Sequence, residues 1–184
     1  MEVDTVPFGC YKKEVFNKIG LFDEQLIRNQ DDEFNARLKQ NGGKIFLIPS
    51  IEIVYLAREN LAKLYNMFYQ YGLFKPLVNK KIKMPSSIRQ FIPLFFVLYL
   101  FLIPISLLLG MKLFYISLIP ISVYLLLNFI VSVKISVRKA NFKLFPYLAV
   151  GFFLTHFSYG FGYLIGIFRF WILNKNNISI APNH

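Results

Sequence analysis

The sequence has a single cysteine, Cys10, two histidines, and no acidic residue after Glu59. One cysteine excludes an internal disulfide, which is compatible with a reducing compartment. The first thirty residues contain no apolar run behind a basic start, so no secretory signal is predicted. The chain also has no Asp-x-Asp pair, a spacing often used to hold a divalent cation.

The uneven distribution of charge divides the chain into two parts. All ten Asp and Glu lie at or before Glu59 with eight Lys and Arg, so this stretch has a net charge of 8 − 10 = −2. The remainder has thirteen Lys and Arg and no acid, giving +13. A basic, apolar tail suits a bilayer with anionic headgroups better than a nucleic acid, so we expect a membrane and no nucleic-acid partner.

Three long uncharged runs occupy the second part, at about 90–111, 113–133 and 144–168. Each has roughly the 20 residues needed to cross a bilayer, so residues 90–174 are predicted to hold three transmembrane helices, followed by a tail over 175–184. Lys and Arg cluster before the first run and between the second and third, whereas Lys112 alone separates the first two. This pattern predicts a multi-pass protein of the cell (plasma) membrane with a cytoplasmic first part and an external C-terminus.

The third run contains groups with two interpretations each. Gly162 and Gly166 have the small-xxx-small spacing of close helix packing, but glycine is also common in membrane helices. His156 is either a functional ionisable group or a neutral histidine hydrogen-bonded to a neighbouring helix.

Residues 1–58 alternate helical and strand-like patterns. Helices are expected at 11–19, ending at Gly20, and at 31–40, ending at Gly42 and Gly43. A strand is expected at 44–48, and a second strand or an extended segment at 51–56. The alternation predicts an α/β sheet, but so few strands make part of a sheet, which needs further strands or a partner.

Residues 59–89 join the two parts. Asn60 is a candidate N-cap, and apolar residues recur at helical spacing as far as about Phe74. A basic segment follows before the first uncharged run. We therefore predict an amphipathic helix that lies at the cytoplasmic membrane interface or packs on the first part of the chain; the two are compatible.

Asp31, Asp32 and Glu33 open the second predicted helix. Carboxylates in a first turn favour the positive end of the helix dipole, which accounts for one or two of them. Three adjacent acids repel one another, so a second interpretation is a catalytic carboxylate that accepts a proton from an attacking hydroxyl.

The order of motifs over residues 3–75 resembles membrane-anchored family 2 glycosyltransferases, including the succinoglycan-type enzymes of polysaccharide biosynthesis in the cell envelope. The motifs are "FGCYKKEVF", "IGLFDE", "QDDEFNAR", the glycine turn with "KIFLI", and a helix leading into the membrane. The resemblance implies that residues 1–58 are the C-terminal half of a GT-A domain, with a nucleotide-binding half not represented in this sequence.

The resemblance also implies site residues. Asp31 occupies the position of the general base, Asp32 is the alternative if the register slips by one, and Glu33 matches a frequent second acid. Gln70 and Phe74 stand where related synthases carry Gln-x-x-Arg-Trp near the acceptor and the diphosphate, with Leu73 in place of arginine. Gly9 stands on the same acceptor side.

The expected activity is an inverting transfer, of EC 2.4 type, from a nucleotide-sugar donor to a polysaccharide or lipid-linked acceptor. Mg²⁺ or Mn²⁺ is expected for the complete enzyme, but no metal ligand is assigned in this chain. The chain alone is expected to be inactive and to need the missing half or a synthase partner. The alternative is a catalytically inactive membrane subunit or scaffold of a polysaccharide-synthesis complex.

Overall fold

The computed structural model describes residues 1–6, 8–56, 58–85 and 87–175. The predicted tail, 175–184, lies outside these residues except for Lys175. The elements follow in the order β1 (Glu2–Val3), α1 (Lys13–Ile19), α2 (Gln30–Gln40), β2 (Ile45–Phe46), α3 (Leu61–Ile82), the 3₁₀ turn η1 (Ile88–Gln90), α4 (Phe91–Leu108), α5 (Met111–Arg138), α6 (Leu144–Ile167) and the π-helical turn η2 (Phe168–Ile172).

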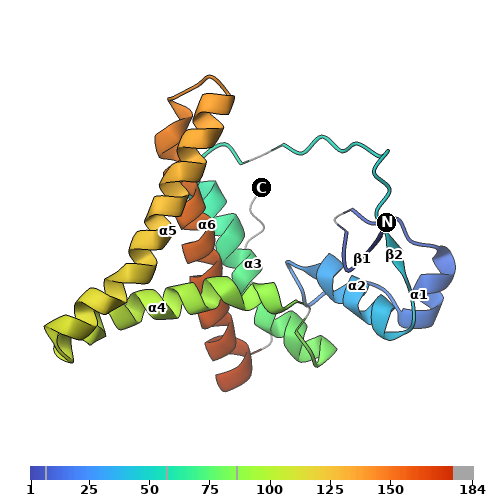
Figure 1. The fold of residues 1–184 in the computed structure, drawn as a ribbon. Helices are drawn as coiled ribbons and strands as arrows, with labels where there is room; N and C mark the ends of the chain where they lie inside the picture. The colour runs from blue at the N-terminus through green and yellow to red at the C-terminus, as the bar shows by residue number, and fades with distance from the viewer. Residues whose placement is uncertain (7, 57, 86, 176–184) are drawn as a thin grey trace.

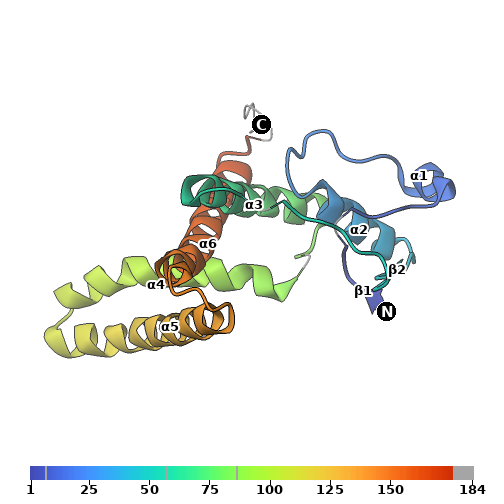
Figure 2. The ribbon, with the colours of Figure 1, turned by 90° about the horizontal axis from the view of Figure 1, so that it is seen from above.

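The molecule has three parts arranged side by side. The head, residues 1–56, contains β1, α1, α2 and β2 and lies on one side of α3 and α6 (Figure 1). The hairpin of α4 and α5 extends from the other side of α3 and α6 (Figure 2). The pair of α3 and α6 lies between the head and most of the hairpin, and α4 crosses α6 near its own start (Figure 1 and Figure 2).

The predicted α/β GT-A sheet is wrong. The strands that the described residues contain are β1 and β2, which pair antiparallel with Glu2 opposite Phe46 and Val3 opposite Ile45. Residues 51–56, predicted as a second strand or an extended segment, are extended chain without a partner, and Val54 and Leu56 are 89% and 85% exposed. An apolar run forms a strand only when another strand supplies hydrogen bonds, and none of the described segments does so here.

The two predicted head helices are confirmed as α1 and α2. Gly20 ends α1 with φ of 82°, a conformation that favours glycine. The helices meet through an aromatic cluster around Phe34 of α2, whose ring centroid lies 4.5 Å from that of Phe22, 4.7 Å from Tyr11 and 5.4 Å from Phe16. This cluster is the core of the head and fixes the direction of α2.

Helix α3 begins where the sequence predicts and ends later. The side chain of Asn60 accepts a hydrogen bond from the Lys63 N–H at 2.8 Å, which confirms the N-cap. The helix then continues past Phe74 and through Pro76 to Ile82, and its residues from 72 to 79 are buried. Burial of this stretch against α6 and the head offsets the helix-breaking tendency of Pro76.

Glycines bring the backbones of α3 and α6 together. A Cβ atom on Gly72 would lie 2.0 Å from the Tyr159 carbonyl oxygen, and one on Gly162 would lie 2.2 Å from that of Tyr69. A Cβ atom on Gly166 would lie 2.3 Å from the Leu73 carbonyl oxygen. Gly162 and Gly166 therefore serve close helix packing, and their neighbour is α3.

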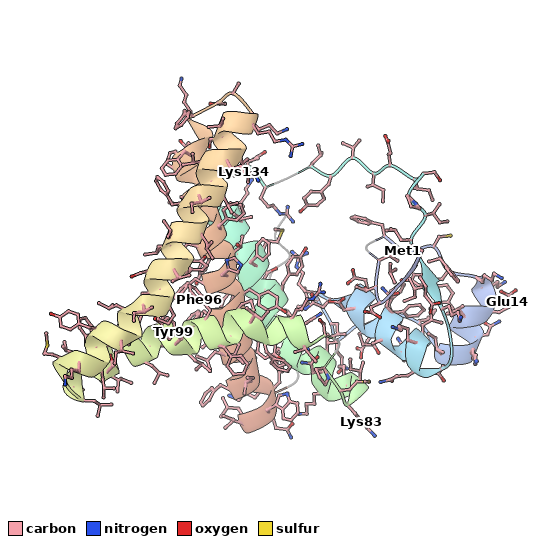
Figure 3. The ribbon with its side chains drawn as sticks, in the orientation of Figure 1. Met1, Glu14, Lys83, Phe96, Tyr99 and Lys134 are labelled. Carbon is pink, nitrogen blue, oxygen red and sulfur yellow. The ribbon has the colours of Figure 1, made fainter. Side chains whose placement is uncertain are left out.

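The three predicted apolar helices are present, which indicates a membrane protein. By length and composition, Ile88–Leu108, Met111–Arg138 and Leu144–Ile172 could each cross a bilayer. Leu109 and Gly110 form the turn between α4 and α5. The Tyr99 hydroxyl donates to the Ser117 carbonyl across this hairpin, and Figure 3 shows Tyr99 and Phe96 along α4.

His156 is hydrogen-bonded inside the apolar helices. Its Nδ1 lies 2.7 Å from the Phe152 carbonyl oxygen of its own helix and 3.1 Å from the Tyr124 hydroxyl of α5. These contacts match the predicted hydrogen bond between His156 and a neighbouring helix.

Candidate functional site

The candidate site lies where the start of α2 meets the middle of α3. The Arg28 Nε donates to the Gln70 Oε1 at 2.9 Å, and the Asn29 Nδ2 donates to the Tyr71 carbonyl at 2.9 Å. Asn29 stands before α2 with φ of 61°, a left-handed conformation that asparagine tolerates. These contacts bring Gln70 beside the acidic cluster, although 37 or more residues separate them in the sequence.

Asp32 joins the head to α3 through an ion pair with Lys75. The Lys75 side chain is 11% exposed and that of Asp32 is 22% exposed, so this pair is largely shielded from water. The Thr5 hydroxyl also lies 3.4 Å from the Asp32 Oδ1. Because its charge is already matched, Asp32 is less available as a proton acceptor than an unpaired carboxylate.

Glu33 acts within the head. Both of its carboxylate oxygens accept from Arg37 at 2.9 Å, one helical turn further along α2. Arg37 also donates to the Ile19 carbonyl and, at 2.8 Å, to the Leu21 carbonyl. This bidentate pair ties the end of α1 to α2, so Glu33 has a structural partner in the described residues.

Asp31 differs from the two acids that follow it. Its Oδ1 accepts the Asp32 backbone N–H at 3.0 Å, and no side-chain cation among the described residues forms an ion pair with it. Partial burial, and then the negative charge of Asp32, raise the pKa of the Asp31 carboxyl above its usual range. A carboxylate with a raised pKa is a stronger base, which suits proton abstraction.

Tyr11 and Asn35 form a polar wall next to Asp31. The Tyr11 hydroxyl donates to the Asn35 Oδ1 at 2.7 Å, and the Asn35 Nδ2 donates to the Thr5 hydroxyl at 2.8 Å. Burial, and then the charge of Asp31, raise the pKa of Tyr11, so the two groups are close enough to interact. Gly9 covers the Tyr11 ring, because a Cβ atom there would lie 2.5 Å from the hydroxyl oxygen.

The structure separates the remaining predicted site residues. Gln70 is buried and faces Arg28 at the site. Phe74 is fully buried in the cluster that contains Leu26 and Phe170, so its ring supports α3 from within the core. Leu73 packs in the same cluster and does not replace the charge of the arginine expected in the motif.

The residues present do not form a site for the expected Mg²⁺ or Mn²⁺. Among the residues that the structure describes, no three His, Cys, Asp or Glu side chains converge to hold a metal ion. Asp32 and Glu33 are already neutralised by Lys75 and Arg37. No chemical step is therefore assigned to a metal held by this chain.

Several residues that build the site were not predicted from the sequence. Arg28 and Asn29 precede the acidic cluster and hold it to α3, and Asn35 lies one turn after Asp31 with its side chain fully buried. The spacing of Asp31 and Asn35, four residues apart, places both on one side of the helix and is a signal visible in the sequence. Arg28 and Asn29 carry no such signal.

Comparisons with known proteins confirm the resemblance predicted from the sequence. The chain is 26% identical over 167 residues to the dolichyl N-acetyl-alpha-D-glucosaminyl phosphate 3-beta-D-2,3-diacetamido-2,3-dideoxy-beta-D-glucuronosyltransferase of Methanococcus voltae, covering 90% of this chain and 48% of that protein. It is 30% identical over 81 residues to the succinoglycan biosynthesis protein ExoA of Rhizobium meliloti, covering 44% of this chain and 24% of that protein. No family model and no solved structure matches the chain.

The chain spans about half the length of the first relative and about a quarter of the second. The first relative is named as a transferase of a glycosyl group and the second as a protein of succinoglycan biosynthesis. The matching segment of the first covers nearly all of this chain, including its apolar helices.

Proposed function

We propose that this chain takes part in glycosyl transfer at a membrane, from a nucleotide-sugar donor to a glycan or lipid-linked acceptor, with Asp31 as the general base. Two observations support the proposal: the likeness to a named glucuronosyltransferase, and the place of Asp31 at the junction of α2 and α3. The observation that carries it is that Asp31, alone among the three adjacent acids, forms no ion pair in the described residues.

The proposed reaction is an inverting displacement. Asp31 accepts the proton of the acceptor hydroxyl while the hydroxyl oxygen forms a bond to the anomeric carbon of the donor. The bond from that carbon to the diphosphate oxygen breaks, and the nucleoside diphosphate leaves with the electron pair. The raised pKa of Asp31 increases its basicity, and Asp32 contributes to that rise through its negative charge.

Neighbouring groups have positioning roles in this proposal. The Asp32–Lys75 pair and the Arg28–Gln70 hydrogen bond hold α2 at a fixed place on α3. Arg28 also brings a positive charge beside Gln70, where Leu73 provides none. An anionic leaving group is stabilised by such a charge. Gly9 keeps its predicted place on the acceptor side as part of the proposal, whereas Phe74, fully buried in the core, supports α3 from within.

The head is proposed to be cytoplasmic. Most of the Lys and Arg after Glu59 lie either before α4 or between the end of α5 and the start of α6, while the turn between α4 and α5 is followed by Lys112 alone. Lys and Arg favour the cytoplasmic side of a bilayer. Nucleotide sugars are then available to the head, and a lipid-linked acceptor reaches it from the membrane.

One observation favours the alternative of a non-catalytic subunit or scaffold. The head exposes an apolar segment from Phe46 to Leu56, in which Ile51, Ile53 and Tyr55 are each more than half exposed. An exposed apolar surface of this kind marks a contact with another protein segment. A subunit that docks a synthase through this segment would not need Asp31.

The test replaces Asp31 with Asn on the chromosome of the native host, in whatever gene product carries this sequence. Membranes are assayed with a panel of radiolabelled nucleotide sugars for label in lipid and polysaccharide fractions. We expect transfer to fall by roughly 10²–10⁴-fold, the usual contribution of a general base. Asp32→Asn is the matched control and should retain more activity, because its charge is paired with Lys75.

Thermal stability separates chemistry from folding in this test. The pKa of folded Asp31 is raised, so its contribution to stability is present below the unfolded pKa and is lost as pH rises through the folded pKa. An asparagine at this position has no carboxyl group to ionise, so the Asp31→Asn variant does not lose this contribution to stability as pH rises. It should therefore be at least as stable as the wild type at neutral pH. Full transfer by Asp31→Asn membranes would reject Asp31 as the base. Transfer unchanged in all three acid variants, including Glu33→Gln, would favour the scaffold.

A further inference from the structure

Helix α6 contacts the α4–α5 hairpin in two places, near the start of α4 and in the second half of α5. Both places lie away from the turn that joins α4 to α5. In the first part of α6, the Ala149 carbonyl accepts from the Asn128 Nδ2 of the second half of α5 at 3.0 Å. In the later part of α6, Gly160 fits against the carbonyl of Pro93, which stands just after α4 begins. A hairpin that crosses a bilayer enters and leaves it on the same side. The start of α4 and the end of α5 must then both lie on that side. The two ends of α6 therefore lie toward that one side.

Helix α3 runs beside α6 over most of its length and in the same direction. Leu64 contacts Gly151 near one end, and the Lys80 Nζ donates to the Phe170 carbonyl at 2.8 Å near the other. The glycines described above close the space between the helices at their middle. A helix of the length of α3 is about 33 Å long, so an α6 that crossed the hydrocarbon core would carry α3 with it.

The face of α3 away from α6 carries charged contacts with the head. Lys75 pairs with Asp32, and Lys81 pairs with Asp23 one to two turns further on. Tyr159, which meets the backbone of α3 at Gly72, stands near the middle of the apolar run of α6. If α6 crossed the bilayer, these ion pairs and the start of α2 would enter the hydrocarbon core or its far side, which is strongly unfavourable.

The positions of the basic residues agree with a topology in which the start of α4, the end of α5 and both ends of α6 lie on one side of the bilayer. Lys134 on α5 and Lys83 after α3 lie toward opposite ends of the α3–α6 pair (Figure 3). Arg169 and Lys175 follow α6. If α6 does not cross, every Lys and Arg after Glu59 except Lys112 stands on the head side, as the positive-inside tendency favours.

The exposed side chains at the ends of α6 suit a membrane surface. Tyr147 at its start and Trp171 after its end are 65% and 59% exposed, and Ile172 and Phe168 are exposed beside Trp171. Tyrosine and tryptophan concentrate at the level of lipid headgroups, where one edge of the ring is apolar and the other wet. Both ends of α6 thus carry side chains typical of an interfacial helix.

We infer that only the α4–α5 hairpin crosses the bilayer, and that α6 lies along the membrane surface on the head side, paired with α3. The lipid surface is the partner of the exposed side chains at the two ends of α6, Tyr147 at one and Trp171 at the other. Lys175 then stands on the same side as the head, in contrast to the external C-terminus expected from three crossings. This inference concerns sidedness relative to the head and does not depend on the proposed chemistry.

The test uses thiol labelling in sealed membrane vesicles of both orientations. The native Cys10 is exposed in the head and marks the head side. In a Cys10→Ser background, Leu173→Cys reports the end of α6 and Leu109→Cys reports the hairpin turn; both positions are exposed. A membrane-impermeant maleimide should label Cys10 and the Leu173→Cys thiol in the same vesicle orientation, and the Leu109→Cys thiol in the opposite one.

Labelling of the Leu173→Cys thiol together with the Leu109→Cys thiol would overturn the inference and establish three crossings. A second measurement tests the same inference if the cysteine variants do not accumulate in the membrane. Green fluorescent protein or alkaline phosphatase fused after His184 in the otherwise native chain should give fluorescence without phosphatase activity, if the head is cytoplasmic. An active phosphatase fusion beside a reduced, cytoplasmic Cys10 would equally reject a head-side α6.

Discussion

The two faces of α3 are held by contacts of opposite character. Toward α6 the contact is backbone against backbone, made possible by glycines at Gly72, Gly162 and Gly166. Toward the head it combines burial of Leu26 in the apolar cluster of α3 with long polar side chains, Gln70 and Lys75, that reach across to residues of the head. The first kind of contact tolerates no added atom, whereas the second tolerates changes that keep charge and hydrogen bonding matched.

This difference separates two tasks within one helix. A close-packed interface fixes the position of α3 because van der Waals contacts fall off steeply with distance. A polar interface fixes the start of α2 while leaving Asp31 without a cationic partner in the described residues. Substitutions on the α6 face should therefore act on stability, and substitutions on the head face should act on both stability and the proposed chemistry.

The largest effect on stability is expected from Gly162→Ala. The new Cβ atom would lie 2.2 Å from the Tyr69 carbonyl oxygen, which cannot rotate away, so the helices must separate. Overpacking of this kind costs about 1–3 kcal/mol, and we expect the upper part of that range. Thermal unfolding in detergent can be followed by the fluorescence of Trp171, whose Nε1 donates to the Pro76 carbonyl across the same interface.

Gly151→Ala is the matched control for that prediction. A Cβ atom there meets Leu64 at 3.9 Å, an ordinary contact. Alanine favours helix over glycine by about 1 kcal/mol, so this variant should be unchanged or more stable. If Gly151→Ala and Gly162→Ala destabilise equally, glycine-mediated packing against α3 is not the cause.

An intermediate effect is expected from Lys75→Met, which leaves Asp32 partly buried without its partner. Breaking a fully buried pair costs about 3–5 kcal/mol, and the partial exposure of Asp32 lowers our expectation to about 1–2 kcal/mol. The double variant Asp32→Asn with Lys75→Met removes both charges. Its melting temperature should recover most of the loss, and a failure to recover would show that Lys75 acts by packing alone.

The smallest effect is expected from Asn60→Ala, which removes the side-chain acceptor for the Lys63 N–H at the start of α3. Loss of an N-cap costs about 0.5–1 kcal/mol at an exposed helix end. Asn60→Ser keeps a capping oxygen and should behave as the wild type in the same melting experiment. Because this end of α3 lies away from the acidic cluster, sugar transfer should be unaffected; a fall in transfer would link the cap to the site.

Features set by neighbouring residues could be predicted from the sequence. The N-cap at Asn60, the end of α1 at Gly20 and the three apolar helices all depend on side chains within a few residues of one another. The sheet could not be predicted, because an apolar run such as 51–56 records a tendency toward burial without specifying a partner. The end of α3 was missed because Pro76 is a helix breaker in isolation and only burial retains it.

The candidate site shows the same limit. The acidic cluster and Gln70 could be selected from the sequence, and the structure brings them to one junction. Which acid keeps a free charge depends on Lys75, 43 residues after Asp32, and on Arg28 beside Gln70. Contacts at such separations leave no periodic signal, so the distinction between Asp31 and Asp32 required the fold.

The turn of the α4–α5 hairpin has a consequence for the biogenesis of the protein. It consists of Leu109 and Gly110, and Lys112 is the sole charged residue between Arg89 and Lys134. A hairpin inserted as one unit must bring only this charge through the hydrocarbon layer, at about 2.5–3.5 kcal/mol on translocon-based scales. The two predominantly apolar runs that flank Lys112, about twenty residues each, far outweigh that barrier by their transfer into lipid. The nascent chain can therefore anchor itself without exporting any folded segment.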